Sequence, residues 1–285
     1  MASSINPTVR RRRLGSELRR LREQKGMTAE EVAARLLVSQ SKISRLENGR
    51  RSISQRDVRD LCGVYGVEDH RMVDSLMQMA RESRQQGWWH AFGDVPYSVY
   101  IGLETDAASL RVYESQIVPG LLQTKNYAEA AIAKMMPEAT PEQVEKRMHV
   151  RIRRQDRVND LGSPLRLWAV VDEAALRRVV GNREIMREQL LHLAHLSTLP
   201  HVTVQLLPFD SGAHPGLNGQ FAILEFDDAT DTSVVYLEGV TSDLYLEKDA
   251  DVQVYSVMYE HLRAQALSAE QTQQFITEVA DEYAR

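Results

Sequence analysis

Residues 27–49 carry the pattern of two short amphipathic helices separated by a turn. Thr28 followed by Glu31 is a capping box, so the first helix is expected to begin there. Ser39 is a second N-cap, and Asn48-Gly49 is expected to end the second helix, because glycine readily adopts the left-handed conformation found at many helix C-termini. The residues expected to point inward are Val32, Ala33, Leu36, Ile43 and Leu46.

Two capped helices joined in this way have the helix-turn-helix layout, which places its second helix in the major groove of DNA. Leu37 and Val38 are expected to form the turn. Glutamine suits adenine, and arginine and lysine suit guanine, so polar residues facing outward can read bases. The alternative is a helix pair whose polar face is only solvated. The predicted base-reading residues are Gln40, Ser41, Lys42, Ser44 and Arg45.

The charge of the chain is distributed unevenly. Residues 1–51 hold 13 Lys and Arg against five Asp and Glu, a net charge of +8 in a chain whose net charge is −5. The remaining residues therefore carry −13 and are not expected to touch DNA. A basic end of this kind is typical of nucleic-acid-binding proteins. Because lysine and arginine release counterions from the phosphates, binding is expected to weaken as salt rises.

The segment from Leu14 to Leu76 resembles the Xre or lambda-repressor-like domain, a compact bundle of about five helices. LGSELRRLREQKG resembles its first helix, and ISQRDVRDLCGVYGV resembles its fourth helix and the following turn. Leu37 departs from the family pattern, since glycine is common at this turn position, and Ala29 stands where several phage repressors have a bracing glutamine. The predicted phosphate contacts are Thr28, Ser39, Asn48, Arg50 and Arg51, of which the last three match the loop that holds the DNA backbone in that family.

An arginine run, Arg10–Arg13, follows a segment expected to be disordered. A basic arm can enter the minor groove or lie along phosphates, and Arg12 and Arg13 are the predicted contacts. Two alternatives stay open: a solubilising tail, or the charged start of the first helix. The predicted divisions are an arm over residues 1–13, a helix-turn-helix domain over 14–84, an aromatic linker over 85–102 and a further domain over 103–285.

Length and composition agree with an ordinary two-domain protein. The chain has 285 residues, of which 43 % are hydrophobic and 26 % charged. No apolar run reaches the roughly 20 residues of a membrane helix, and no apolar segment follows the basic start as in a secretory signal. We therefore expect a cytoplasmic, nucleoid-associated protein with no membrane partner. Cys62 is the one cysteine, which excludes an internal disulfide and a thiolate metal cluster.

Residues 85–100 break the helical pattern with glycines and a proline, yet they concentrate aromatic side chains. Aromatic residues gain little free energy unless they are buried. This segment is therefore expected to dock onto the second domain or a dimer partner, and an effector cage is the alternative. The residues predicted for that interface or effector site are Trp88, Trp89, Tyr97 and Tyr100.

The rest of the chain alternates helical and strand patterns, which predicts an α+β domain. A helix is expected over residues 103–116 from the spacing of Leu103, Ala107, Leu110 and Tyr113. Apolar or alternating runs predict strands over residues 166–173, 201–208, 220–226 and 233–238. Further helices are expected over residues 126–136, 140–158, 174–181, 182–199, 250–263 and 268–284.

No pattern in this half is typical of a catalytic or cofactor site. His192 and His195 share a helix face but lack the HExxH spacing of a zinc site. His201, Asp210 and His214 flank a strand and a Gly/Pro loop that lacks the residues of a nucleotide cradle. We therefore expect no enzyme, no cofactor and no metal. An enzyme with a DNA-targeting domain is the weak alternative.

From about Trp88 onward the chain resembles a domain of many actinobacterial Xre-type regulators, long of unknown function and now often called antitoxin-like. VPGLLQTKNYAEA (118–130), RLWAVVDEAALRRVVG (166–181), VTVQLLPFDSGAHPGLNGQFAILEF (202–226) and VVYLEG (234–239) carry the resemblance. It implies modulation by a small protein from a neighbouring gene. The favoured function is a homodimeric regulator of double-stranded DNA that responds to such a partner or to a small ligand. The alternative is an antitoxin that also represses its own operon.

Overall fold

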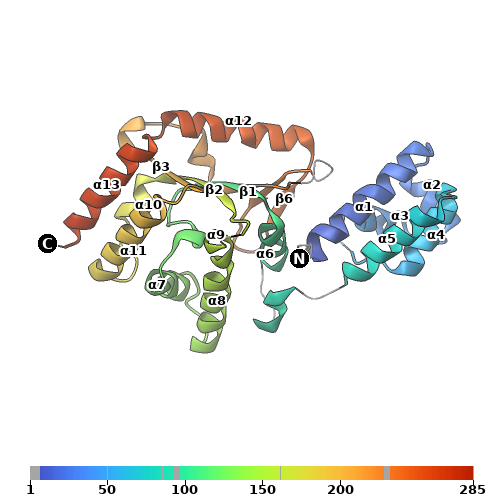
Figure 1. The fold of residues 1–285 in the computed structure, drawn as a ribbon, viewed down its shortest axis with the longest axis horizontal. Coiled ribbons are helices and arrows are strands. Elements are labelled where there is room, and N and C mark those ends of the chain that lie inside the picture. Colours follow the sequence, from blue (N-terminus) through green and yellow to red (C-terminus); the bar gives the residue numbers. More distant parts are fainter. Residues whose placement is uncertain are drawn as a thin grey trace. The chain divides into compact units, whose positions relative to one another are not determined.

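The computed structural model describes residues 7–49, 51–84, 87–92, 97–160, 162–227 and 232–284. The chain forms two compact units, one of residues 1–93 and 98–106 and the other of residues 94–97 and 107–285. The first unit is helical and the second combines helices with a six-stranded sheet (Figure 1). This confirms the predicted fold class, an all-α helix-turn-helix bundle followed by an α+β domain.

The first unit packs its helices around one apolar core. Leu14 and Leu18 from the first helix meet Ile43, Leu46 and Val58 in that core. Of the residues expected to point inward, Val32, Ala33, Ile43 and Leu46 are buried and Leu36 is half-buried. The elements are α1 (Pro7–Gln24), α2 (Ala29–Arg35), α3 (Gln40–Glu47), α4 (Gln55–Tyr65), α5 (His70–Glu82), the 3₁₀ helix η1 (Trp88–Phe92) and α6 (Ser98–Asp106).

Side-chain caps fix where the helices of the motif begin. The Thr28 hydroxyl accepts from the Glu31 backbone N–H while the Glu31 carboxylate accepts from the Thr28 N–H, so the predicted capping box is present. Ser39 caps α3 as predicted, accepting from the Lys42 N–H at 3.2 Å. Asn48 is the C-cap of α3, and Gly49 follows with a φ of 62°.

The arginine run lies inside α1, because that helix begins at Pro7. The structure therefore differs from the predicted arm over residues 1–13. It agrees instead with the alternative that the arginine run is the charged start of the first helix. Residues 1–6 lie outside the described residues. Two arginines anchor this end of the helix: Arg10 pairs with Glu82 on α5 at 2.9 Å, and Arg11 donates to the Gly49 carbonyl at 2.6 Å.

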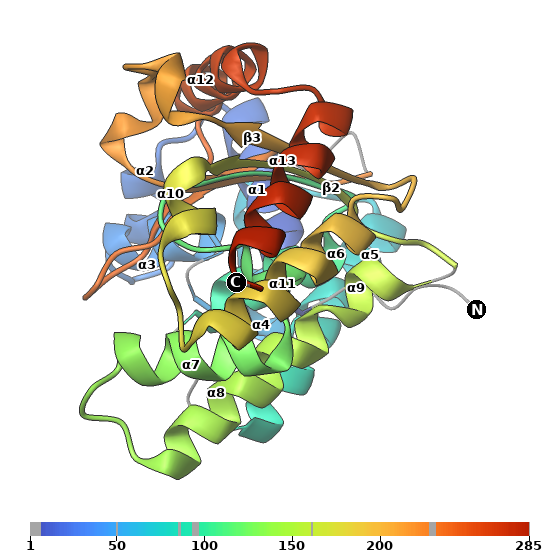
Figure 2. The ribbon, with the colours of Figure 1, turned by 90° about the vertical axis from the view of Figure 1, so that its left-hand side faces the viewer.

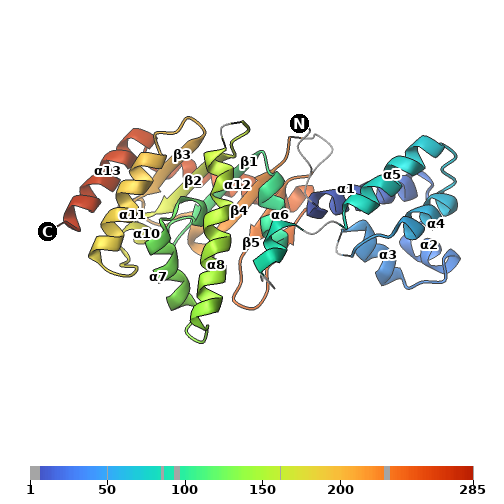
Figure 3. The ribbon, with the colours of Figure 1, turned by 60° about the horizontal axis from the view of Figure 1, so that its bottom comes forward.

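The second unit is built on a mixed sheet with the strand order β3-β2-β1-β4-β5-β6 (Figure 3). The strands β1, β2 and β3 run parallel, and β4, β5 and β6 join antiparallel to their neighbours. The bounds are β1 (Ser109–Glu114), β2 (Arg166–Asp172), β3 (Val202–Leu207), β4 (Phe221–Glu225), β5 (Val234–Leu237) and β6 (Leu244–Leu246). The four predicted strands are confirmed as β2 to β5.

The predicted helix over residues 103–116 is wrong in its second half, where β1 stands. Helix α6 ends at Asp106, and the following residues alternate as a strand. Leu110 and Val112 lie on one face of that strand, while Arg111 and Tyr113 lie on the other. The helical spacing of Leu110 and Tyr113 with earlier residues misled the prediction, because short apolar runs fit both periods.

Helices cover both faces of the sheet. Figure 2 shows α12 (Asp249–Gln265) on one side, and α7 (Lys125–Met135), α8 (Pro141–Arg154) and α11 (Arg183–Leu196) on the other. A buried cluster that includes Tyr113, Phe221 and Tyr259 joins the sheet to α12. The remaining elements are the 3₁₀ helices η2 (Gly120–Leu122), η3 (Phe209–Ser211) and η4 (Pro215–Asn218), and the helices α9 (Asp156–Asn159), α10 (Glu173–Arg177) and α13 (Ala269–Glu282).

The outer edge of β3 is covered by the chain that leads from α12 into α13. The Leu267 N–H donates to the Leu206 carbonyl at 2.8 Å. The Leu206 N–H donates to the Thr272 hydroxyl at 2.9 Å, and Thr272 is itself buried. The Leu206 backbone groups, which would otherwise be unpaired at the edge of the sheet, are therefore hydrogen-bonded by residues of the same chain.

Candidate DNA interface

Helix α3 divides cleanly into a buried face and an exposed polar face. Ile43, Leu46 and Glu47 are buried against the core of the first unit. The exposed side chains are Gln40, Ser41, Ser44 and Arg45, which are four of the five predicted base-reading residues. The exposed face thus offers an amide, two hydroxyls and a guanidinium, and each of these groups can hydrogen-bond with a base edge or a phosphate.

Lys42, the fifth predicted reading residue, is directed elsewhere. Its ammonium nitrogen lies 2.8 Å from Asp57 Oδ1 on α4, and about a quarter of its side chain is exposed. Burial tends to raise the pKa of Asp57, but hydrogen bonds from Lys42 and Ser54 outweigh it and lower that pKa. The sequence missed this pair because it joins residues 15 positions apart across two helices. Lys42 therefore links α3 to the start of α4 in this structure.

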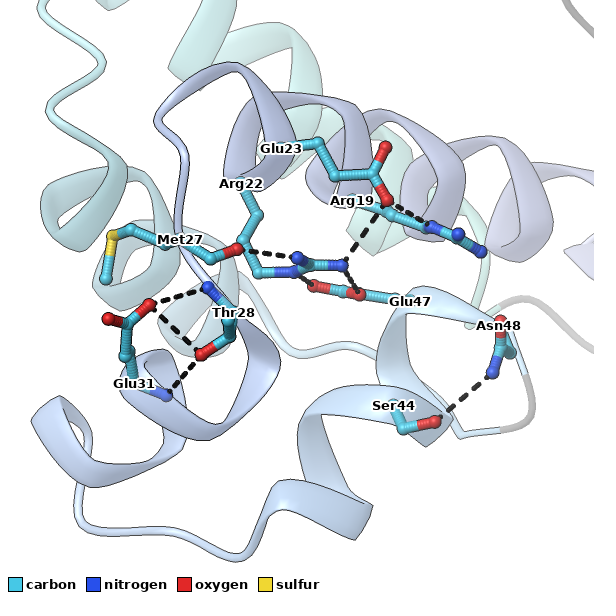
Figure 4. A network of polar contacts seen from close by, with 9 residues as sticks. All are labelled: Arg19, Arg22, Glu23, Met27, Thr28, Glu31, Ser44, Glu47 and Asn48. Atoms are coloured by element: carbon cyan, nitrogen blue, oxygen red, sulfur yellow. Dashed lines mark hydrogen bonds and ion pairs between the residues drawn. The ribbon is translucent and has the colours of Figure 1, made fainter.

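Hydrogen bonds within α3 orient its exposed side chains. The Arg45 Nε donates to the Ser41 carbonyl at 3.1 Å, which folds the guanidinium back along the helix. The Ser39 and Ser41 hydroxyls lie 3.0 Å apart, and the Asn48 amide donates to the Ser44 hydroxyl at 3.3 Å (Figure 4 shows the last of these). Each of these bonds lies at the surface, where water or DNA can replace it at little cost.

A buried ion pair holds the end of α3 against α1 (Figure 4). Arg22 donates from Nε to Glu47 Oε1 at 2.7 Å and from Nη2 to Glu47 Oε2 at 2.9 Å. Its third nitrogen, Nη1, donates to the Met27 carbonyl at 2.7 Å, so the loop before α2 is held as well. The hydrogen bond to Glu47 raises the pKa of Arg22. This bidentate geometry fixes the direction of α3 more strictly than a single contact would.

Sequence reasoning missed this pair, although Glu47 carried a signal. It stands four residues after Ile43 and directly after Leu46, and both of these residues were expected to face inward. A carboxylate on the buried side of a helix requires a partner, since an unpaired buried charge is strongly unfavourable. Arg22 is that partner, and it comes from α1 rather than from the motif itself.

A glycine allows α1 and α3 to approach closely. A Cβ at Gly15 would lie 2.5 Å from the Glu47 carbonyl oxygen and 2.7 Å from that of Leu46. These are backbone atoms that cannot rotate away. Any larger residue at this position would therefore push α1 away from the C-terminal end of α3.

The turn between α2 and α3 contains Leu37, the residue that departs from the family's preference for glycine at this position. Leu37 has a φ of 54°, and among the described residues it is the one non-glycine residue with positive φ. Its side chain is 93 % exposed, so no packing offsets the strain of this conformation. The turn thus keeps the backbone geometry that suits glycine, although leucine occupies it.

The predicted phosphate contacts surround α3 at several positions. Thr28, Ser39, Asn48 and Arg51 are exposed, and the Arg51 N–H donates to the Arg45 carbonyl at 3.1 Å. Arg12 and Arg13 are half-buried on α1, and the backbone and Cγ of Arg12 lie against Gly49. Arg50 lies outside the described residues.

The aromatic residues of the predicted interface are buried or half-buried in the structure. Trp89 is 2 % exposed and Tyr100 is 7 % exposed. Trp88 is half-buried, with its ring edge-on to Trp89 at 5.9 Å between centroids. Tyr97 lies under the Arg154 guanidinium, 5.8 Å from the ring centroid. Trp89 and Tyr100 are core residues, whereas Trp88 and Tyr97 are half-buried, and a role of these four residues in effector binding stays a prediction.

The histidines considered for catalysis are separated. His201 lies just before β3 and its Nε2 is 2.8 Å from the Val158 carbonyl, whereas Asp210 and His214 follow the other end of that strand. Burial, with His195 adding to it, lowers the pKa of His192. Within the described ranges, no three His, Cys, Asp or Glu side chains are placed to share a metal ion. None of the helices described there is both long and apolar enough to cross a membrane.

Comparisons with known proteins identify both units. Residues 13–76 match the family model described as a helix-turn-helix domain, and residues 97–278 match the one described as a domain of unknown function, DUF5753. The chain is 41 % identical over 63 residues to an uncharacterized HTH-type transcriptional regulator, y4dJ, of Sinorhizobium fredii (strain NBRC 101917 / NGR234). That alignment covers 22 % of this chain and 82 % of the relative. No solved structure matches the chain.

Proposed function

Because this chain belongs to the DUF5753 family and joins its domain to that of the HTH-type transcriptional regulators, we propose that it regulates transcription by sequence-specific binding to DNA. The observation that carries the proposal is the exposed polar face of α3, presented on a helix that Arg22 and Glu47 hold in place. Such a helix can enter the major groove with its first residues toward the bases.

In this proposal Gln40 and Arg45 read base edges, and the shorter side chains of Ser41 and Ser44 add further hydrogen bonds to the DNA. Arg45 must first release its bond to the Ser41 carbonyl, which costs little at an exposed site. Lys42 reads a base or a phosphate only if its ammonium leaves Asp57. Phosphates are held by Thr28, Ser39, Asn48, Arg50 and Arg51, with Arg12 and Arg13 alongside.

The second unit is proposed to form a homodimer and to receive a small partner protein or ligand that modulates DNA binding. A dimer would place two copies of α3 on half-sites about one helical turn apart. If the chain is instead an antitoxin, a neighbouring gene product expressed alone should arrest growth. Co-expression of this chain should then restore it.

The test is binding to the duplex upstream of the protein's own gene and to a random duplex, over a series of salt concentrations. Gln40→Ala and Arg45→Ala should each lose about 1–3 kcal/mol on the specific duplex and little on the random one. Arg50→Ala and Arg51→Ala should weaken both duplexes similarly and reduce the salt slope by about 1.

Arg187→Ala is the matched control, since Arg187 is an exposed arginine on α11 of the second unit and should leave binding unchanged. If Gln40→Ala and Arg45→Ala reduced affinity equally on both duplexes, the exposed face of α3 would not be the reading face. Equal, weak binding of the native protein to both duplexes would mean that the operator does not lie upstream of the protein's own gene.

A further inference from the structure

Asp57, near the start of α4, uses its two carboxylate oxygens for different partners. One oxygen, Oδ2, accepts from the Ser54 backbone N–H at 3.0 Å and from the Ser54 hydroxyl, which completes the capping box of α4. The other, Oδ1, accepts from the Lys42 ammonium at 2.8 Å. The carboxylate also lies at a helix N-terminus, where the helix dipole favours a negative charge. Lys42 is therefore attached to a group that its own helix holds in place.

Lys42 belongs to the first turn of α3, which is the end that a recognition helix turns toward the bases. Gln40 and Ser41, just before it, are exposed, whereas only 27 % of the Lys42 side chain is exposed. A small hollow of about 40 Å³ lies beside the ion pair, and Lys42 and Asp57 line it together with apolar side chains of α3, α4 and the turn between α2 and α3. The lysine stem thus lies on the inner side of α3, and its ammonium is kept from the exposed polar face.

A free lysine at this position would strengthen binding to DNA of any sequence. Contacts to phosphates carry no sequence information, whereas contacts to base edges do. Because the lysine stem is long and flexible, a released Lys42 ammonium would find a phosphate on every duplex. On the operator, the base contacts of Gln40 and Arg45 would fix the position of α3 and so limit where Lys42 can reach. Random DNA would therefore gain more affinity than the operator.

We propose that Asp57 is a positioning residue for selectivity: it holds the Lys42 ammonium away from the DNA phosphates, so that affinity depends more strongly on the bases that α3 reads. This inference rests on the proposed function of α3 as the recognition helix. Specificity is a difference between two affinities, and it rises when the competing complex is weakened. The competing complex that Asp57 weakens is that of this protein with DNA of any other sequence.

Two substitutions at position 57 separate the charge of this side chain from its capping role. The chain already completes capping boxes with glutamine, at Gln143 in α8 and Gln271 in α13, and with glutamate, at Glu31 in α2. Asp57→Gln should therefore keep α4 capped while it releases Lys42. Asp57→Glu should keep both the cap and the ion pair, which makes it the matched control.

The experiment measures how the affinity of the full chain depends on salt, for a random duplex and for the specific duplex. One additional phosphate contact steepens the slope of log affinity against log salt by about 0.9. Asp57→Gln should show this steeper slope on the random duplex, with a gain in affinity that falls about threefold between about 50 and about 200 mM salt. Its gain on the specific duplex should be smaller, so the ratio of the two affinities should fall. Asp57→Glu should have the native slope.

Two further variants identify the cation that is released. Asp60→Asn removes one negative charge from the same helix and should leave the salt slope unchanged, because its partner Arg56, at 3.7 Å, already has a side chain that is 90 % exposed. Adding Lys42→Met to Asp57→Gln should abolish the extra slope, since methionine keeps the apolar stem without the charge. An extra slope that survived in this double variant would come from another cation and would overturn the proposal.

Failure of this inference and failure of the proposed function give different results. If the native protein preferred the specific duplex and Asp57→Gln had the native salt slope, Asp57 would not be what keeps Lys42 from DNA, and only the inference would be overturned. An equal gain on both duplexes would likewise overturn the role in selectivity. If the native protein preferred no duplex over random DNA, the proposed function would fail, and the inference that rests on it would fail as well.

Discussion

Arg22 on α1 holds Glu47, the last residue of α3, through two hydrogen bonds of 2.7 and 2.9 Å in an environment where both side chains are largely buried. The helix with the proposed reading face is thus aimed by a helix outside the motif. The same guanidinium also holds the Met27 carbonyl, so one side chain joins three segments of the chain.

Removing one partner of this pair should destabilise the first unit more than removing both. Glu47→Leu leaves a buried guanidinium without its carboxylate and should cost about 3–5 kcal/mol of unfolding free energy. The double variant Arg22→Met with Glu47→Leu should recover part of that loss. Urea unfolding of Glu47→Leu, Arg22→Met and the double variant measures the coupling, and additive losses would show that the pair contributes nothing specific.

Two glycines should respond to the same substitution with opposite signs. Gly15→Ala places a methyl group 2.5 Å from the Glu47 carbonyl oxygen, so it should destabilise the first unit and weaken DNA binding. Gly63→Ala on α4 meets nothing within 4 Å and should stabilise the unit by about 0.5–1 kcal/mol, since alanine is the better helix former. Melting temperatures of the two variants test the predicted opposite changes in stability. A stabilising Gly15→Ala would contradict the close packing of α1 against α3.

Leu37→Gly should stabilise the motif although it removes a side chain. The substitution relieves about 1–2 kcal/mol of left-handed strain, of which the greater freedom of glycine in the unfolded chain offsets about half. The control is Leu37→Ala, which keeps the strain and should change little, because Leu37 is 93 % exposed. If alanine stabilised as much as glycine, the backbone conformation would not be the cause.

Glu114, at the end of β1, should make the second unit less stable as pH rises. Burial, with the nearby Glu238 adding to it and Arg151 and Arg154 opposing it, raises the pKa of Glu114 to about 8. The folded protein therefore holds this proton more tightly than the unfolded chain, whose glutamate titrates near 4.5. The stability this provides is fully present below about pH 4.5 and is lost as pH rises to about 8, at about 1.4 kcal/mol per pKa unit.

Glu114→Gln keeps the shape of the side chain and should remove that pH dependence. One carboxylate oxygen of Glu114 is enclosed and finds no hydrogen-bond partner in the described part of the chain, so the uncharged amide suits the site. Melting temperatures of the second unit at intervals from pH 5 to 8.5 measure the effect. Parallel profiles for the native protein and the variant would assign the dependence to another group.

The motif was readable from the sequence because its signals are local. Thr28 with Glu31 marks one helix start and Ser39 marks the other, through hydrogen bonds between residues three positions apart. The preference of the turn for glycine likewise pointed to Leu37, which the structure has in the left-handed conformation. Propensity, capping and hydrophobic period all agree there, which is when a short segment specifies its own structure.

What the sequence did not reveal depends on partners far along the chain. The pairs of Arg22 with Glu47 and of Lys42 with Asp57 join different helices, and no local pattern identifies them. Residues 109–114 become a strand because β2 and β4 lie on either side of them. Tertiary context overrode a helical spacing at that point.

The covering of β3 also bears on how the protein avoids misassembly. An exposed strand edge is a template on which another chain can pair, and it can seed aggregation. Here Leu267 and Thr272 occupy the edge groups of Leu206 before another molecule can. A chain cut after residue 265 would keep every strand of the sheet and yet expose that edge. Loss of the last helix should therefore produce insoluble assemblies rather than a smaller folded regulator.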